Sequence, residues 1–497
     1  MTPPRLLFWL GFTTAALAAR AGAEERNFWP GKVSQVNPAG QVESWSAGGP
    51  LFYGQPAPEG GRVSGFRPIY LERHAPNGVL AEAAFLYPLY IYRSYGDTYE
   101  SSLFDLINRY GRKDGAPASS RTEEQTFDVW PFYFSRETGD PTTSYHAVFP
   151  IAGTVQDFLG MQKVSWVLFP LYVQSEHHGA VTTATPWPIL RVTHGAEEGF
   201  ALWPLFGHDE RPGAFRKSFY LWPLIWDNTI QPPEDKPAGT PPTRQVGFLP
   251  FYAAERGPGK VNEAYLWPFF GYTDRTAPDR YHETRYFWPF LVQGRGDSQY
   301  VNRWGPIYTH SIRKGIDKTW YGWPLWREVR LNEGGVDQTK KQLFYFVYFD
   351  LVQRSPTNPS AAPAEKLHVW PIFSLWDNGA GHRQFQFPSP LEVFFPNTNE
   401  VRENWSPFFS LYRSDCRATG DRRSSVLWDA VTWESHPRQE RSSFHLGPLV
   451  SMELSPEEDR WSVASGLFGW KRLPGAGWRV FGMEFSRNHP KTRSLAR

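Results

Sequence analysis

The chain has 497 residues, and its 52 Lys and Arg against 50 Asp and Glu give a net formal charge of +2. This balance excludes the basic excess that recruits nucleic acid, so no nucleic-acid partner is expected. A single cysteine, Cys416, excludes an internal disulfide, so stability must come from packing, to which an aromatic content of 17% contributes.

The first residues have the pattern of a secretory signal peptide. Arg5 precedes an apolar run from Leu6 to Ala19, and the small residues Ala21 and Ala23 follow. The run is shorter than the ~20 residues that a membrane-spanning helix needs. We therefore expect a signal peptide over residues 1–23 and a protein that is exported to the outer membrane or periplasm.

A short phrase then recurs along the chain: an apolar or aromatic residue, proline, and another apolar residue. Between Pro131 and Pro324 the phrases follow each other at steps of 16 to 27 residues, most of them near nineteen. Turn-forming stretches rich in Gly, Pro and Asp lie between the phrases. The run FYFVYFDLV, Phe344 to Val352, is interpreted as a repeat that has lost its proline.

Strand-length apolar runs at a fixed step predict an all-β fold. We expect an antiparallel meander of ~19-residue Trp-Pro repeats, either barrel-like or a large curved sheet. The alternative is a β-hairpin solenoid, in which each repeat is a small hairpin stacked on the next. Residues 24–485 are expected to form a single repeat-built β domain, and residues 486–497 a basic C-terminal tail.

The role of the proline separates the two architectures. In the meander, proline marks a bend or bulge in the middle of one long strand, and ~24 such strands are expected from a step of about nineteen residues. The tryptophans before proline would then belong to the core. In the rival arrangement, proline begins a second strand and each repeat is a complete hairpin.

A few segments depart from the repeat. Ser101 to Gly111 spaces Leu103, Leu106 and Ile107 on one helical face, which predicts a helix. The segments Gln231 to Thr243 and Arg354 to Glu365 are expected to be long surface loops. Near the end, SGLFGWKRLPGAGWRVFGMEF predicts two strands around the turn LPGAG.

Aromatic residues that follow the phrase are the candidates for ligand binding, because rings stack on sugar faces while nearby polar groups take the hydroxyls. These candidates are Trp226, Trp326, Trp376, Asp227 and Asp377. Carboxylates at strand ends also serve to keep a sheet edge soluble. No spacing in the chain indicates a metal site, a cofactor or a catalytic residue.

The sequence resembles exported bacterial proteins with Trp-Pro-Leu-Phe-like β repeats. The resemblance covers most of the chain after Phe66 and implies no activity. The first hypothesis is a non-enzymatic cell-envelope protein, a structural or transport element associated with the outer membrane and with envelope components as partners. The alternatives are a soluble secreted polysaccharide-binding protein that uses rim aromatics, and a glycan-processing enzyme with two rim carboxylates.

Overall fold

The computed structural model describes residues 24–37, 40–57, 60–113, 124–233, 235–237, 239–473, 475 and 477–482. The expected signal peptide and the expected basic tail lie outside the described residues. The structure is all-β, with 59% of its residues in strands and 4% in helices. The predicted fold class, an antiparallel meander built from repeats, is confirmed.

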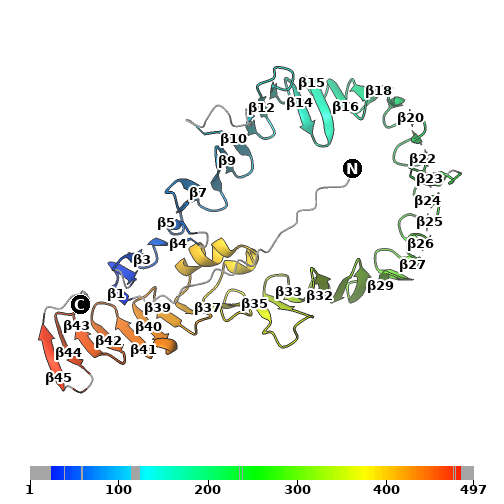
Figure 1. Cartoon of the computed structure of the whole chain (residues 1–497). Coiled ribbons are helices and arrows are strands. Elements are labelled where there is room, and N and C mark those ends of the chain that lie inside the picture. Colours follow the sequence, from blue (N-terminus) through cyan, green and yellow to red (C-terminus); the bar gives the residue numbers. More distant parts are fainter. Residues whose placement is uncertain are drawn as a thin grey trace, which may run out of the picture. The chain divides into compact units, whose positions relative to one another are not determined.

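The described chain forms 45 strands, and within each of its two units the strands that follow one another in sequence pair antiparallel (Figure 1). Strands β1 and β45 each have a partner on one side only, so strand pairing does not close the sheet. The strands fall into two compact units. Unit 1 joins the residues up to Pro56 with those from Thr419 onward, and unit 2 spans Ala57–Ala418.

Unit 1 contains eleven strands and one short 3-10 helix. They are β1 (Glu24–Phe28), β2 (Lys32–Val36), β3 (Val42–Ala47), β4 (Phe52–Pro56), β39 (Arg422–Val426), β40 (Val431–His436), η4 (Pro437–Gln439), β41 (Arg441–Leu446), β42 (Val450–Leu454), β43 (Asp459–Val463), β44 (Phe468–Arg472) and β45 (Trp478–Gly482). Strands β44 and β45 confirm the predicted pair around LPGAG.

Unit 2 contains the other strands and a helical insertion. Its first half holds β5 (Arg62–Phe66), β6 (Tyr70–His74), β7 (Leu80–Phe85), β8 (Tyr90–Tyr95), β9 (Thr98–Leu103), β10 (Ile107–Arg112), β11 (Gln125–Val129), β12 (Tyr133–Glu137), β13 (Tyr145–Val148), β14 (Ala152–Phe158), β15 (Met161–Val167), β16 (Tyr172–His177), β17 (Ala180–Ala184), β18 (Leu190–Gly195), β19 (Glu198–Leu202), β20 (Phe206–Arg211), β21 (Phe215–Tyr220) and β22 (Ile225–Ile230).

The second half of unit 2 ends with the insertion and one last strand. It holds β23 (Thr243–Phe248), β24 (Tyr252–Gly257), β25 (Lys260–Tyr265), β26 (Phe270–Arg275), β27 (Tyr281–Phe287), β28 (Leu291–Gly296), β29 (Gln299–Trp304), β30 (Tyr308–Arg313), β31 (Ile316–Tyr321), β32 (Trp326–Glu333), β33 (Val336–Leu343), β34 (Tyr348–Arg354), β35 (Ala364–Val369), β36 (Phe373–Asp377), β37 (Arg383–Phe387), η1 (Glu392–Phe394), η2 (Val401–Trp405), η3 (Ser406–Phe408) and β38 (Tyr412–Cys416). The two predicted long loops lie between β22 and β23 and between β34 and β35.

The proline phrase forms turns, not the centres of strands. In the segment around Pro204, β19 ends at Leu202 and β20 begins at Phe206, so the proline lies between two strands. The expectation of ~24 long strands was therefore wrong. Each repeat contributes two strands, as in the rival arrangement, but the proline lies in the turn and not at the start of a strand. Most turns that follow the odd-numbered strands from β7 to β35 contain a proline. The peptide bond before this proline is cis in each of them except the turn with Pro306.

The helix predicted over Ser101 to Gly111 is also absent from the structure. Strand β9 ends at Leu103 and β10 starts at Ile107, with Phe104 and Asp105 in the turn between them. Both turn residues have positive φ, 55° each, which is the backbone of a type I′ hairpin turn. An aspartate stands here at the place of the proline.

Among the described strands, extensive backbone contacts occur only between neighbours in sequence, while side-chain contacts also join β1 to β39 and β40 in unit 1. The helical insertion is different, because it contacts both ends of unit 2. The centre of the Tyr87 ring lies 6.1 Å from that of Phe395 and 6.2 Å from that of Trp405. The Arg67 side chain donates a hydrogen bond to the backbone oxygen of Asn404.

Candidate functional site: the aromatic edge of unit 2

The topology sorts the turns of unit 2 onto two edges. In an antiparallel meander, the ends of all odd-numbered strands lie at one edge and the ends of all even-numbered strands at the other. Every proline-phrase turn of unit 2 follows an odd-numbered strand. We call the turns that follow the odd-numbered strands from β7 to β35 the aromatic edge. The turns that follow the even-numbered strands from β8 to β34 are the polar edge.

Hydrogen bonds join each turn of the aromatic edge to the next. The backbone nitrogen of Leu221 donates to the oxygen of Leu205 at 2.6 Å, and that of Leu249 donates to the oxygen of Leu224 at 2.7 Å. The same type of backbone hydrogen bond joins the successive turns from that of Phe104 to that of Trp370. The turns thus continue the strand ladder and hold their side chains at a common level.

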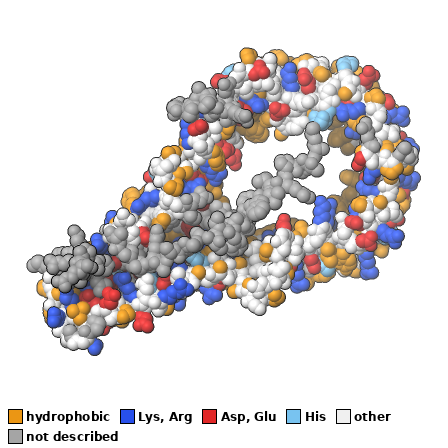
Figure 2. Space-filling view, viewed as in Figure 1, with side chains coloured by type: hydrophobic (Ala, Val, Ile, Leu, Met, Phe, Trp, Pro, Cys, Tyr) orange, Lys and Arg blue, Asp and Glu red, His pale blue; other side chains and the backbone are white. Residues whose placement is uncertain are grey.

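The side chains at the tips of these turns are exposed and apolar. The residue after the proline is an exposed large hydrophobe at Phe132, Ile151, Leu171, Ile189, Leu205, Leu224, Phe251, Phe269, Phe290, Ile307, Leu325 and Ile372. Ile307, for example, is 75% exposed. Figure 2 shows hydrophobic side chains at the surface along the strands of unit 2.

Charge separates the two edges. Among the turns of the aromatic edge, from Leu86 to Ile372, Asp105 is the only residue with a charged side chain. The polar edge carries turns such as RKG and TAPDR, rich in glycine and in charged residues. An apolar band on one edge and a solvated edge opposite it mark the band as an interaction surface.

The tryptophans of the phrase lie on this surface. They were predicted to be core residues, but the turn position exposes Trp130, Trp203, Trp222, Trp267, Trp288 and Trp323. Trp222 is 52% exposed. The prediction failed because it placed these residues in strand centres.

The chain itself covers one part of the aromatic edge. Trp370 is half-buried, and its ring lies against Phe394 of η1, which also contacts Phe346 of the preceding turn. The Trp370 indole nitrogen donates to the oxygen of Pro390 at 3.0 Å. At this place the rings of Phe346 and Trp370 are partly covered by another apolar side chain of the same chain.

The residues predicted as ligand-binding lie on three separate strands. Trp226 and Asp227 are in β22, where the Trp226 ring covers Gly247 of the neighbouring strand β23. Asp227 accepts a hydrogen bond from the Arg244 guanidinium at 2.8 Å, which lowers the pKa of its carboxyl group. Both residues therefore have partners within the sheet.

The other candidates have different surroundings. Trp326 begins β32, and its ring stacks on Tyr348 with centroids 5.9 Å apart. The Arg402 guanidinium lies 3.6 Å from the centre of the Trp376 ring, and Asp377 pairs with an arginine of β37 at 2.8 Å. The structure does not bring the three tryptophans together, and their role in ligand binding remains a prediction.

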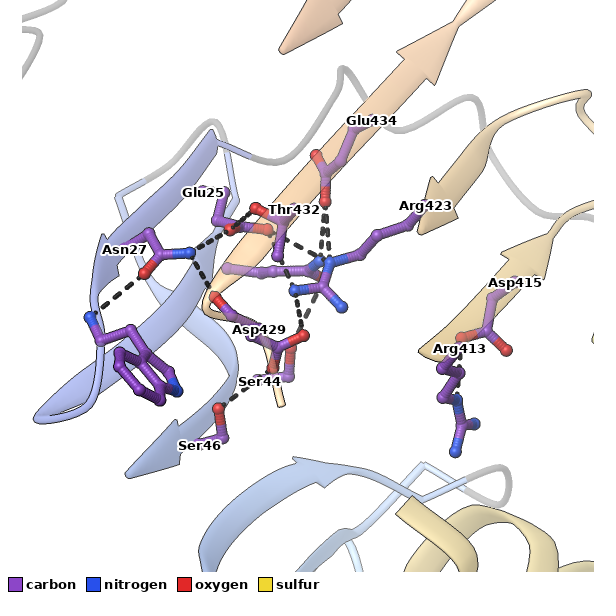
Figure 3. Close-up of polar contacts among 12 residues, drawn as sticks. Glu25, Asn27, Ser44, Ser46, Arg413, Asp415, Arg423, Asp429, Thr432 and Glu434 are labelled. Atoms are coloured by element: carbon purple, nitrogen blue, oxygen red, sulfur yellow. Dashed lines mark hydrogen bonds and ion pairs between the residues drawn. The ribbon is translucent and has the colours of Figure 1, made fainter. Parts of the chain in front are cut away.

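Unit 1 holds a buried cluster of charges around Arg423 (Figure 3). The guanidinium contacts carboxylate oxygens of Glu25 at 3.1 Å, Asp429 at 3.0 Å and Glu434 at 3.1 Å. Thr432 donates a further hydrogen bond to Glu25, whose side chain is fully buried. The cluster fixes the N-terminal strand β1 to strands β39 and β40.

The pKa values in the cluster follow from burial and pairing. Burial raises the pKa of Glu25. Burial alone would also raise the pKa of Glu434, but a hydrogen bond from His436 and the charge of Arg423 outweigh it and lower the value. The same hydrogen bond raises the pKa of His436. With every member engaged in contacts that join strands, the cluster is a structural tie.

Within the described residues, no group of three or more His, Cys, Asp or Glu side chains is placed to hold a metal ion. None of the helices in the described part of the chain is long and apolar enough to cross a membrane. No protein-family model matches the sequence, and no curated protein matches it significantly.

Proposed function

We propose that the protein is a non-enzymatic structural element of the bacterial cell envelope that attaches to a membrane surface through its aromatic edge. The observation that carries the proposal is the row of exposed apolar tips, aligned by turn-to-turn hydrogen bonds and almost free of charge. The N-terminal sequence pattern supports export, which would bring the protein to the periplasmic side of the outer membrane.

A lipid surface fits this edge better than a protein partner does. Protein interfaces concentrate their binding energy in a few distinct positions. Here the same chemistry repeats from turn to turn, with tryptophan beside leucine, isoleucine or phenylalanine. Tryptophan is enriched where membrane and water meet, because its ring is apolar and its nitrogen donates a hydrogen bond.

The available binding energy is sufficient. Fully burying a Leu, Ile or Phe side chain contributes roughly 1.5–3 kcal/mol, so a tip that is about half exposed contributes about 1 kcal/mol. If about six tips enter the membrane interface together, they supply about 6 kcal/mol, or about four powers of ten in partitioning. Attachment thus requires only part of the edge.

The test is flotation of the full chain with vesicles of phosphatidylethanolamine and phosphatidylglycerol. The wild-type protein should float with the vesicles, and a variant with Trp130, Trp222 and Trp323 all changed to serine should float at least tenfold less. These side chains are exposed, so the circular dichroism spectrum should not change. Fractionation and alkaline washing of membranes from expressing cells would test the attachment in cells.

A matched control lies on the opposite edge. Leu159 is 85% exposed in a turn of the polar edge. Leu159→Glu should float as the wild type does, whereas Ile307→Glu should float less. Equal flotation of the two variants, or no flotation of the wild type, would refute attachment through the aromatic edge.

A further inference from the structure

A polar hollow lies on one face of strands β31 to β34 in unit 2. Its volume is 630 Å³, within the ~300–1,000 Å³ range typical of small-ligand sites. Strands β32 and β33 have eight residues each and are the longest in the described chain. The hollow lies toward their polar-edge end, because its lining includes Gly315 and Asn332, away from the exposed tips.

The strand register places three rows of side chains on this face. Asp317, Arg330, Thr339 and Val352 pair across the four strands and form the row that lines the hollow. The adjacent row includes Lys341 opposite Asp350, and both also line the hollow. The third row is aromatic and runs Tyr321, Trp326, Leu343, Tyr348.

The charges that line the hollow balance. The lining holds three carboxylates, those of Asp317, Asp337 and Asp350, and three cations, those of Arg330, Lys341 and Arg354. Arg330 also pairs with Glu328 beside the hollow at 2.8 Å. The side chains of Asn332 and Thr339 lie on the same face and add further polar groups. Such a lining offers donors and acceptors in similar measure and has no net charge to select an ion.

One of these carboxylates has an oxygen atom without a hydrogen-bond donor. The Oδ1 atom of Asp350 is buried and accepts no hydrogen bond from the described residues, and its Oδ2 atom lies 3.5 Å from the Tyr348 hydroxyl. Burial raises the pKa of this carboxyl group. A hydroxyl group entering the hollow would supply the missing donor after a small rotation of the side chain.

The aromatic row gives the site a flat apolar part. The Trp326 and Tyr348 rings are within 22° of parallel, and Tyr321 beside them is exposed. The aromatic row is one row from Lys341 and Asp350 and two rows, about 13 Å at 3.3 Å per residue, from the row that includes Thr339. A ligand that covers both must be extended, flat and apolar on one side, and rich in hydroxyl groups.

From this juxtaposition we propose that the face of β31 to β34 binds an uncharged oligosaccharide. A sugar ring stacks on Trp326 and Tyr348, and the next sugars place their hydroxyl groups among Asp350, Lys341 and the lining of the hollow. The site is independent of membrane attachment, because the proposal does not use the tips of the aromatic edge.

The experiment titrates the full chain with uncharged α-1,4- and β-1,4-linked hexasaccharides, with an oligomer of uronic acid as the charged comparison. Binding is followed by isothermal calorimetry and by tryptophan fluorescence. At least one uncharged hexasaccharide should bind, and Trp326→Ala and Asp350→Asn should each weaken it about tenfold or more. The uronic acid oligomer should bind more weakly than the uncharged sugar.

Trp304→Ala is the matched control. Trp304 is an exposed tryptophan of β29 on the same face, outside the hollow, and its removal should leave binding unchanged. Trp326→Phe keeps a ring and should retain most of the affinity, which covers the case in which Trp326→Ala fails to fold. Absence of binding to every hexasaccharide, or equal losses in the Trp304 and Trp326 variants, would overturn the proposal.

Discussion

The buried cluster of unit 1 allows a quantitative prediction. Arg423→Met removes the cation that contacts three carboxylates at 3.0–3.1 Å. The Glu25 side chain is fully buried and that of Glu434 is 6% exposed, so neither gains full hydration when the cation is lost. Breaking a buried ion pair by removing one partner costs about 3–5 kcal/mol. We expect unit 1 to lose about this much stability at pH 7.5.

The pH dependence of that loss is a second part of the same prediction. Without Arg423, the pKa values of Glu25 and Glu434 should rise in the folded state. The folded variant then binds protons more tightly than the unfolded chain, so its stability should increase as the pH falls. The difference between variant and wild type should therefore be smaller at pH 5 than at pH 7.5.

The assay is urea unfolding combined with hydrogen exchange measured by mass spectrometry. Exchange in peptides from β1 and β40 reports unit 1 separately from unit 2, which a single optical signal would not. Arg441→Met is the control, because its contact with Glu453 is 4.0 Å long, and it should cost less than about 1 kcal/mol. A loss below about 1 kcal/mol for Arg423→Met, or a loss independent of pH, would refute the reasoning.

Three further predictions concern pH, packing and turn geometry. The pKa of His436 is raised, so its contribution to stability is complete at a pH below the ordinary histidine value of 6.5 and decreases as the pH rises. The pKa of Glu434 is lowered, so its contribution is complete at a pH above the ordinary glutamate value of 4.5 and decreases as the pH falls. The stabilisation by this pair should be greatest between those values, and His436→Gln should flatten the dependence of the urea midpoint on pH. Gly247→Ala would place a methyl group 2.2 Å from the Trp226 ring and should cost about 1–3 kcal/mol, with less cost in a Trp226→Ala background. Lys314 has a φ of 52° in the turn before a glycine, a backbone conformation that asparagine adopts more readily than lysine. Lys314→Asn should therefore raise the thermal midpoint and increase the free energy of unfolding by up to about 1 kcal/mol. A lower midpoint would contradict a type I′ turn at this position.

The all-β repeat was predictable because both its period and its turn signals are local properties of the sequence. The position of the proline was not, for a physical reason. Turns are ordinarily polar because they face water, whereas the turns of the aromatic edge are apolar. In ETRYFWPFLVQGRG the apolar residues therefore continue through Trp288, Pro289 and Phe290, and the turn looks like the middle of one strand.

Two other features show what could and could not be found. The turn at Phe104 and Asp105 fits the same frame as the proline phrase, with an aspartate at the proline position, so alignment with the repeat could have identified it. The missing proline of the turn after β33 was identified in that way. The packing of the insertion on Tyr87 joins residues more than 300 positions apart, and no local pattern predicts such a contact. The hollow beside Trp326 likewise depends on register across four strands.

The ladder between turns imposes a rule of parity on how such a chain can change in length. Deleting or duplicating a complete hairpin leaves every later turn on its own edge, and the new junction resembles all the others. Gaining or losing a single strand would invert the direction of every strand that follows. All later proline turns would then emerge on the opposite edge. Related chains should therefore differ by even numbers of strands.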